Sequence, residues 1–358
     1  MQKAKTNLGR LSMLLAAALG AGIVATTNQA STHQVAAARS YSKATNQYVV
    51  VKKSGYNFWG NFSWTKKLHY SKNYLNRTLQ VKRIYYKANG SKYYSTYRGG
   101  KWFGYVNATG LTTTKNAQGS GVATSKYAIM NKSGWKTYSG FNWKANHLTK
   151  NYLKHTFQVK RIYYHANGTT YCSLYRGGKW FGYINMNALT STNKKQGNAV
   201  KPSTTLYVSL NKVDKDGFHE DRVWRDLNFK VSDYTNLTAM PYTYTVKAIY
   251  YHSNGQTYYS LYVKNNWMGY VNAKIAKKTG ILGSGSTFWI TKFTTGTDGD
   301  TSLQLLNANL TSKGKAGRLK YGEKLYAKHG YFSANEIQYI GVYTLDGKTF
   351  RGYLPHSF

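Results

Sequence analysis

The chain has 358 residues, with 50 Lys and Arg against 11 Asp and Glu, a formal net charge of +39 at pH 7, and one Cys. Every Asp and Glu lies at position 214 or later, so residues 1–213 cannot form a paired-carboxylate active site or an oxygen-rich metal site. A single Cys excludes an intrachain disulfide and a Cys-x-x-Cys motif. A hydrophobic content of 41% is too high for a disordered polycation, so the sequence predicts a folded protein.

Residues 1–38 are expected to be a secretory signal peptide and leader. Basic residues at positions 3, 5 and 10 precede an apolar run over 11–25, and we expect cleavage between Ala25 and Ala38. A retained N-terminal anchor helix is the alternative. No later segment is apolar for about 18 residues, so a secreted protein without a membrane span is expected after signal removal. Residues 351–358 carry no hydrophobic tail, so we expect any attachment to a surface to be noncovalent.

Most of the remaining chain consists of internal repeats. Residues 79–112 and 157–190 have almost the same sequence, a related copy starts at Tyr244, and a divergent copy starts at Tyr339. The equivalent aromatic residues of the copies, 78, 87 and 83 residues apart, are Trp102, Trp180, Trp267 and Phe350. We expect repeat 1 at 46–113, repeat 2 at 125–191, repeat 3 at 205–277 and a divergent repeat 4 at 286–358. The polar, Gly-rich segments between them are expected to be linkers that allow the repeats some relative freedom.

Turn residues divide each repeat into short strands. Asn-Gly pairs at 89–90, 167–168 and 254–255 separate runs of β-branched and aromatic residues, as positive-φ hairpin turns require. A second turn follows, at Gly99-Gly100 in repeat 1, so each repeat is expected to contain a three-stranded meander. With an earlier strand pair, about 60 residues suffice for a small five-stranded barrel. The sequence therefore predicts an all-β protein built from four small β-barrels in tandem.

Charge is distributed unevenly between the two halves of the chain. Residues 1–200 carry 30 Lys and Arg and no acid, whereas residues 201–358 carry 20 Lys and Arg and 11 acids. A small domain needs roughly 2 to 8 charges for solubility, and a one-sided excess costs self-repulsion, so we expect an anionic partner. Since the chain is expected to be exported, a phosphate-rich polymer of the cell surface is favoured over nucleic acid.

Basic pairs on neighbouring strands, about 4.8 Å apart, can follow such a polymer across a sheet. Together with the tyrosines of the last meander strand, the candidate polymer-binding residues are Lys82, Arg83, Arg98, Lys101, Tyr105, Lys160, Arg161, Arg176, Lys179, Tyr183 and Tyr270. The tyrosines and the nearby Trp102, Trp180 and Trp267 can either stack against a sugar or polymer or fill the core of a small barrel. We expect the core for the tryptophans and leave both interpretations open for the tyrosines.

Other reactive residue types are expected to have structural roles. Cys172 has a tyrosine at the equivalent position of repeats 1 and 3, so we expect a semi-buried packing role rather than a reactive thiol. His165 and His252 share a turn position with Lys87, so we expect a solvated loop there. One acidic cluster lacks the terminal Glu and the sixth-position Gly of an EF-hand loop; its members are Asp214, Asp216, Glu220 and Asp221. Neither a metal nor a cofactor is expected.

Repeats that end in Lys-Trp-Phe-Gly-Tyr, after a Tyr-rich hairpin, resemble the GW modules of Gram-positive surface proteins, a subgroup of bacterial SH3-like domains, and related repeats of lactobacillus surface proteins. The resemblance covers all four repeats from about Tyr48 and is strong in the first three. It implies a tandem array of SH3-like β-barrels, noncovalently attached to lipoteichoic or wall teichoic acid. The Gly-Trp pair of the family is Gly-Tyr here, at 104–105, 182–183, 269–270 and 352–353.

Three functions follow from the residues and the resemblance. The first is a wall-binding surface protein whose cationic repeats hold an anionic polymer, teichoic acid or peptidoglycan, by many weak contacts. The second is an S-layer-type structural protein in which repeats 1 and 2 bind the wall and repeats 3 and 4 self-associate. Residues 343–353 are similar to repeats of lactobacillus S-layer proteins. The third, a wall hydrolase, would need catalytic acids confined to repeat 3, so we expect that the chain is not an enzyme.

Overall fold

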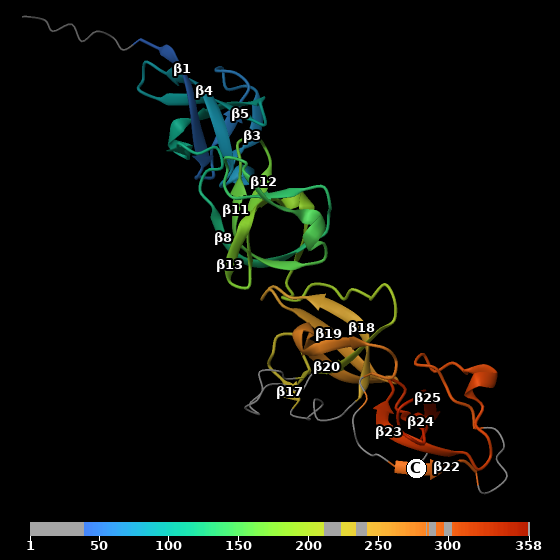
Figure 1. Cartoon of the computed structure of the whole chain (residues 1–358). Helices are drawn as coiled ribbons and strands as arrows, with labels where there is room; N and C mark the ends of the chain where they lie inside the picture. The colour runs from blue at the N-terminus through green and yellow to red at the C-terminus, as the bar shows by residue number, and fades with distance from the viewer. Residues whose placement is uncertain are drawn as a thin grey trace, which may run out of the picture.

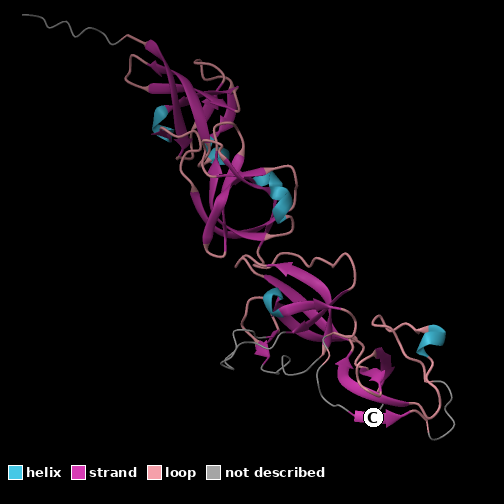
Figure 2. Ribbon diagram, in the orientation of Figure 1, coloured by secondary structure: helices cyan, strands magenta, loops and turns pink. Residues whose placement is uncertain are grey.

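A computed structural model describes residues 39–210, 223–233, 242–283, 285, 291–296 and 303–356. These residues form four antiparallel sheets that follow one another along an elongated molecule (Figure 1). Strands and short 3-10 helices make up the regular structure, and no α-helix occurs in the described ranges (Figure 2). The predicted fold class, all-β repeats in tandem, is confirmed. The expected signal peptide and leader, residues 1–38, lie outside the described part of the chain.

Repeat 1 forms a seven-stranded sheet in the order β3-β2-β6-β5-β4-β1-β7. Its elements are β1 (Tyr41–Val51), β2 (Asn57–Trp59), β3 (Lys67–Tyr70), η1 (Ser71–Tyr74), β4 (Thr78–Tyr86), β5 (Lys92–Arg98), β6 (Lys101–Asn107), η2 (Ala108–Gly110) and β7 (Leu111–Thr114). The predicted meander is β4, β5 and β6. The expected count of five strands is wrong, because β2 and β3 form an extra hairpin and η2 returns the chain to β1, where β7 pairs.

Repeats 2 and 3 have the same strand order. Repeat 2 comprises β8 (Val122–Met130), β9 (Lys136–Tyr138), β10 (Ala145–Leu148), η3 (Thr149–Tyr152), β11 (Thr156–Tyr164), β12 (Thr170–Arg176), β13 (Lys179–Asn185), η4 (Met186–Ala188) and β14 (Leu189–Thr192). Repeat 3 comprises β15 (Leu206–Leu210), β16 (Val223–Trp224), β17 (Ser232–Asp233), β18 (Thr243–Tyr251), β19 (Thr257–Val263), β20 (Asn266–Asn272), η5 (Ala273–Ile275) and β21 (Ala276–Thr279).

Repeat 4 keeps the meander within a four-stranded sheet of order β22-β23-β24-β25. Its elements are β22 (Thr291–Thr294), η6 (Gly314–Gly317), β23 (Lys324–Phe332), β24 (Gln338–Thr344) and β25 (Phe350–Pro355). An isolated bridge joins Leu306 to Tyr353, where repeat 1 pairs Trp59 with Tyr105. Repeat 4 is therefore a reduced form of the same fold. No helix in the described ranges is long and apolar enough to cross a membrane.

Alternation along the strands sorts side chains between the core and the outer face of each sheet. In β6, Phe103 is 7% exposed, whereas the neighbouring Trp102 is 41% exposed. The core of repeat 1 consists of Val49, Val51, Phe58, Leu79, Val81, Ile84, Tyr94, Phe103 and Val106. The expectation that the repeated tryptophans fill the core is wrong, because the additional strands supply enough aliphatic and phenylalanine side chains. Trp180 is also 41% exposed, and Trp267 is half-buried.

The prediction for Cys172 is confirmed, whereas the prediction for the turn histidines is wrong at His252. Cys172 is completely buried in the core of repeat 2, where burial raises the pKa of its thiol to about 12, so its packing role is confirmed. The expected solvated loop is wrong for His252, which is 3% exposed. The loop after β16 covers this side chain, whose Nε2 lies 3.2 Å from the carbonyl oxygen of Leu227. His165 is half-buried.

The segments between repeats contain hydrogen-bonded turns. After repeat 1, the N–H of Gly119 donates to the carbonyl of Asn116 at 3.0 Å, and the carbonyl of Ala117 accepts from the N–H of Ala166 in repeat 2 at 2.8 Å. After repeat 3, the N–H of Gly283 donates to the carbonyl of Gly280 at 3.0 Å. The first linker therefore contacts the repeat that follows it, and the expected relative freedom of the repeats stays a prediction.

Candidate functional site

Each repeat presents three contacting rings on the outer face of its meander, which we call the aromatic triplet. In repeat 1 the triplet is Tyr85, Trp102 and Tyr105. The ring centroids of Trp102 and Tyr105 are 5.4 Å apart, as are those of Tyr85 and Tyr105. The equivalent triplets are Tyr163, Trp180 and Tyr183; Tyr250, Trp267 and Tyr270; and Tyr331, Phe350 and Tyr353. All four repeats therefore retain the same arrangement of rings, although Trp267 is half-buried where Trp102, Trp180 and Phe350 are exposed.

A bulge at Gly104 brings Trp102 and Tyr105 to the same side of β6. The register between β5 and β6 shifts after Thr96, so that Thr96 faces Gly104 and Tyr97 faces Trp102. Gly104 has φ of +129°, and a Cβ there would lie 3.1 Å from the carbonyl oxygen of Trp59. Glycine is required here because the β2 backbone passes so close to β6.

The two tyrosine rings of each triplet meet edge to face, at interplanar angles between 87° and 90°. In repeat 1, burial, with a smaller contribution from the neighbouring Tyr85, raises the pKa of Tyr105. Burial, with a smaller contribution from the neighbouring Tyr183, raises the pKa of Tyr163 to about 12. Burial likewise raises the pKa of Tyr270 to about 12. These phenols stay protonated at neutral pH and can donate hydrogen bonds to an anionic ligand.

A lysine lies beside each triplet, over the ring of a tyrosine on the next strand. Its position is the bulge in the first meander strand, where the register between β4 and β5 shifts after Val81. The ammonium-to-ring distances are 4.3 Å for Lys82 over Tyr97, 4.0 Å for Lys160 over Tyr175, 4.2 Å for Lys247 over Tyr262 and 4.8 Å for Lys328 over Tyr343. Lys82 and Lys160 are nevertheless exposed, so each holds a positive charge in a defined place at the surface.

The loop between β2 and β3 adds further rings to the outer face. Phe62 stacks on Tyr105 at 4.2 Å, and the Lys87 ammonium lies 4.1 Å from the Phe62 ring. Trp64, two residues later, has φ of +58°, and its equivalents Trp143 and Phe229 have +65° and +63°. Large aromatic residues rarely adopt positive φ, and strained backbone of this kind is concentrated at functional sites. In each of the three loops, an aromatic residue with strained backbone therefore lies beside the triplet.

Sequence reasoning missed these loop rings and two of the bulge lysines. The Phe-x-Trp pattern occurs at 62–64 and again at 141–143, so comparison of the upstream halves of the repeats was the available signal. Lys247 follows the same Val as Lys82 and Lys160 do, and was therefore visible in the sequence. Lys328, in the divergent repeat 4, was not.

The other predicted cations occupy three different places. Lys101 and Lys179 are exposed in the second turn, next to Trp102 and Trp180. Arg83 is exposed and donates from Nη1 to the Ser42 hydroxyl at 3.1 Å. Arg161 is also exposed and donates to the carbonyl of Gly121 at 3.2 Å. These four residues, with Lys82 and Lys160, lie on or beside the outer faces of repeats 1 and 2.

Arg98 and Arg176 point elsewhere. Their side chains are half-buried and reach the following repeat, where Nη2 of Arg98 donates to the carbonyl of Gly168 at 3.0 Å. Nη2 of Arg176 donates to the carbonyl of Gly255 at 2.8 Å. The structure thus separates these two guanidinium groups from the aromatic triplets. Their predicted contact with a polymer remains untested.

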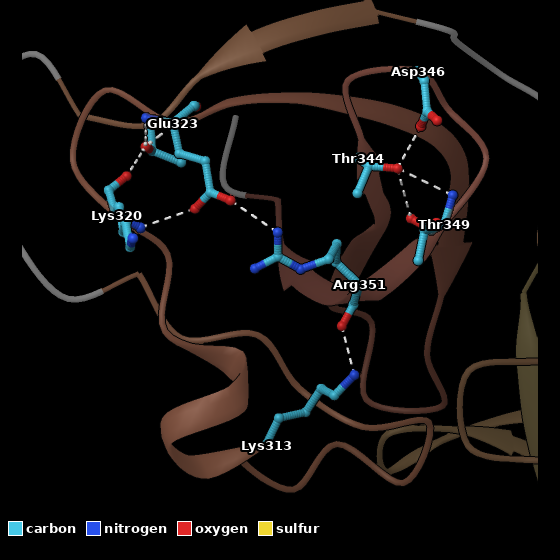
Figure 3. Close-up of polar contacts among 8 residues, drawn as sticks. Lys313, Lys320, Glu323, Thr344, Asp346, Thr349 and Arg351 are labelled. Atoms are coloured by element: carbon cyan, nitrogen blue, oxygen red, sulfur yellow. Dashed lines mark hydrogen bonds and ion pairs between the residues drawn. The ribbon is translucent and has the colours of Figure 1, made fainter.

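The carboxylates described in repeats 3 and 4 stabilise turns. Glu323 pairs with Nη1 of Arg351 at 2.8 Å and accepts from the Lys320 N–H at 3.0 Å (Figure 3). Asp346 accepts from the Thr344 hydroxyl at 2.5 Å. Asp226 accepts from the N–H of Val231 at 2.9 Å. Among the described residues, no group of three or more His, Cys, Asp or Glu can hold a metal ion. The cluster Asp214, Asp216, Glu220 and Asp221 lies outside them.

Comparison with known proteins adds a distant structural likeness. No protein-family model matches the chain. No curated protein matches it either. Among solved structures, a crystal structure of a protein assigned as an autolysin from Listeria monocytogenes is similar over 66% of this chain and 97% of its own, with 13% sequence identity and a TM-score of 0.23.

Proposed function

We propose that the chain is a noncovalent wall-binding surface protein whose cationic repeats bind an anionic wall polymer, lipoteichoic or wall teichoic acid. The observation that carries this proposal is the lysine held over a tyrosine beside an aromatic triplet, in the same geometry in repeats 1, 2 and 3. A poly(polyol phosphate) presents alternating phosphates and CH groups. Lysine and arginine can neutralise the phosphates, while rings and phenol hydroxyls contact the polyol or sugar between them.

Repeats 1 and 2 are the stronger binders in this proposal. They contain the exposed Lys82, Arg83, Lys160 and Arg161, and no acid lies within 1–213 to compete for these cations. Repeat 3 has Ala248 where the other two have Arg83 and Arg161. Each contact is weak in water, so retention on the wall depends on several repeats binding one polymer. We propose no enzymatic activity.

The experiment is retention of the purified protein on intact Gram-positive walls, with and without chemical removal of teichoic acids, across a salt series. Neutralising several phosphates releases counterions, so binding is expected to weaken steeply as salt rises. Binding that persists both at high salt and on walls stripped of teichoic acid would contradict the proposal. Such a result would favour peptidoglycan as the ligand.

A charge variant tests the site itself. Replacing Lys82, Arg83, Lys160 and Arg161 by Ala is expected to weaken wall binding on the order of 1000-fold, at about 1 kcal/mol for each of the four cations as at anionic membrane surfaces. The matched control replaces four exposed lysines away from the triplets, Lys53, Lys115, Lys132 and Lys150. This control removes the same net charge, so equal weakening by both variants would show that position does not matter and would contradict the assigned site.

The second candidate is an S-layer-type structural protein. The contrast in charge between residues 1–200 and 201–358 favours it, because the less cationic half can approach other copies with less repulsion. Electron microscopy of concentrated purified protein tests it. Ordered sheets would support this function beside wall binding, and a monodisperse protein at every concentration would reject it.

A further inference from the structure

The three junctions between repeats use one hydrogen-bond pattern. The second turn of each repeat donates a backbone N–H to the first turn of the next repeat. The donor–acceptor pairs are Gly99 to Ala166 at 2.8 Å, Gly177 to Ser253 at 2.9 Å and Lys264 to Ala334 at 2.7 Å. The same acceptor residues donate their own N–H groups to linker carbonyls, namely Ala117 at 2.8 Å, Lys195 at 2.8 Å and Ile281 at 3.2 Å. One residue is thus held on both sides at every junction.

Burial at this position distinguishes a docked repeat from an undocked one. Ala166 is 7% exposed, Ser253 9% and Ala334 2%. The equivalent residue of repeat 1, Ala88, contacts no other repeat among the described residues and is exposed; its N–H donates to the Ser40 hydroxyl at 3.1 Å. The junctions therefore bury a surface that repeat 1 leaves open.

A pair of contacting side chains adds to each junction. The Arg77 guanidinium lies 4.1 Å from the ring of Tyr164, and the His155 ring stacks on Tyr251 at 4.2 Å. At the third junction, the rings of Tyr242 and Phe332 are 5.3 Å apart. The first member of each pair directly precedes the first meander strand of one repeat. The second member is the last residue of the corresponding strand in the next repeat. Contacts of this kind fix orientation as well as distance.

Arg98 and Arg176 join the first two junctions by a side chain. Each guanidinium donates to the carbonyl of the Gly that ends the Asn-Gly turn of the following repeat, Gly168 or Gly255. The third junction has Val263 at this position, 3% exposed. The two arginines therefore couple repeats 1, 2 and 3, which are the repeats that carry the tryptophan-containing triplets.

We propose that Arg98 and Arg176 are positioning residues that hold repeats 1, 2 and 3 at a fixed spacing, so that one polymer molecule engages all three aromatic triplets at once. The inference rests on the proposed function. A fixed spacing that matches the ligand raises the effective concentration of the second and third sites, and it avoids the entropy cost of ordering the repeats during binding. The cations act here through geometry and not as ligands of the polymer.

The first test needs no ligand. Spin labels at Lys53→Cys and Lys277→Cys, both exposed, report the distance between repeats 1 and 3. The native Cys172 is buried, with a thiol pKa of about 12, and does not compete for the label. We expect a narrow distance distribution that broadens in the double variant Arg98→Ala, Arg176→Ala. An equally narrow distribution in that variant overturns the proposal.

The second test compares a long teichoic acid with a short phosphodiester oligomer that fits one repeat. The arginine variant is expected to bind the long polymer about tenfold or more weakly, a loss within the range that avidity supplies. Its affinity for the short oligomer is expected to be unchanged. The control variant Lys101→Ala, Lys179→Ala removes the same charge from the same turns. It is expected to lower the affinity for both ligands and to leave the spin-label distance distribution narrow. Parallel losses in the two variants overturn the positioning role.

A third variant separates geometry from charge. Two glycines inserted after Lys115 and two after Lys194 lengthen the linkers without changing any cation, and are expected to reproduce the loss for the long polymer. If they leave its affinity unchanged, the positioning role is overturned. If the unmodified protein binds neither ligand, the proposed function fails, and the role of the arginines in polymer binding fails with it. Broader spin-label distances in the arginine variant would still show that the two arginines couple the repeats.

Discussion

Neighbouring residues in one strand have opposite roles in this protein. Trp102 is 41% exposed and contacts Tyr105 of its triplet, whereas Phe103 is 7% exposed and lies in the core beside Phe58 at 4.9 Å between ring centroids. Composition cannot distinguish the two, since both are large and aromatic. Their positions in the pleat place one ring on the exposed outer face and the other in the core.

Replacing Trp102 and Trp180 by Ala tests this separation. The expected result is a loss of about 30-fold in wall binding, from roughly 1 kcal/mol for each of the two exposed rings, with little change in melting temperature. Phe103→Ala is the matched control and is expected to destabilise repeat 1 by about 3 kcal/mol or more. Wall retention and thermal unfolding measure the two effects. A large loss of stability in the tryptophan variant would contradict the exposed role.

At the scale of elements, the bulge in the last meander strand recurs throughout the array. The register shifts at the equivalent point in β13, β20 and β25, next to Gly182, Gly269 and Gly352. All these glycines have φ between +123° and +154°. The bulge lets β2 pair with β6 and turns two rings to one side, so a single backbone feature both closes the sheet and builds the triplet.

Gly104→Ala is expected to be costly. A Cβ at this position would lie 3.1 Å from the Trp59 carbonyl oxygen and 3.2 Å from the Phe58 Cβ, at a φ that side chains rarely adopt. We expect a loss of roughly 1–3 kcal/mol in the free energy of unfolding, measured by denaturant titration. Gly280→Ala is the control, because no atom lies within 4 Å of its added Cβ and its φ is not positive. Equal stability of the two variants would contradict the close approach.

At the scale of the whole molecule, the middle junction joins the strongly cationic half to the less charged half. His155 lies in this junction, stacked on Tyr251 and near Tyr152 and Arg176. Burial, and the Arg176 charge to a smaller extent, lowers the pKa of His155 to about 4 from its ordinary value of 6.5. The other two junctions have Arg77 and Tyr242 at this position instead of a histidine.

Acid is therefore expected to weaken the middle junction selectively. Because the folded protein disfavours protonated His155, its contribution to stability is complete above pH 6.5 and is lost as the pH falls toward 4. His155→Tyr, which installs the residue type of the third junction, is expected to reduce the fall in melting temperature between pH 7 and pH 4.5 by a few degrees. Because the chain contains other histidines, the quantity to compare is the change in melting temperature with pH in the variant and in the unmodified protein. Identical pH dependence in both proteins would refute the role of His155.

The sequence by itself determined the repeats, the all-β class, the hairpin turns, the excess of cations and the packing of Cys172. These features follow from composition, local turn preferences and comparison between copies, all of which are visible without the fold. The predicted repeat boundaries and the wall ligand stay predictions. The expected strand count was too low because β2, β3 and β7 are short and carry little periodicity.

Only the tertiary structure decided which rings face outward and what Arg98 does. Trp102 faces solvent because a bulge at Gly104 sets its side of the sheet, and bulges depend on pairing between strands that are distant in sequence. Arg98 reaches Gly168, 70 residues away, through a contact that exists only when two folded repeats meet. Local patterns specify the strands, whereas register and docking depend on long-range contacts that no short segment contains.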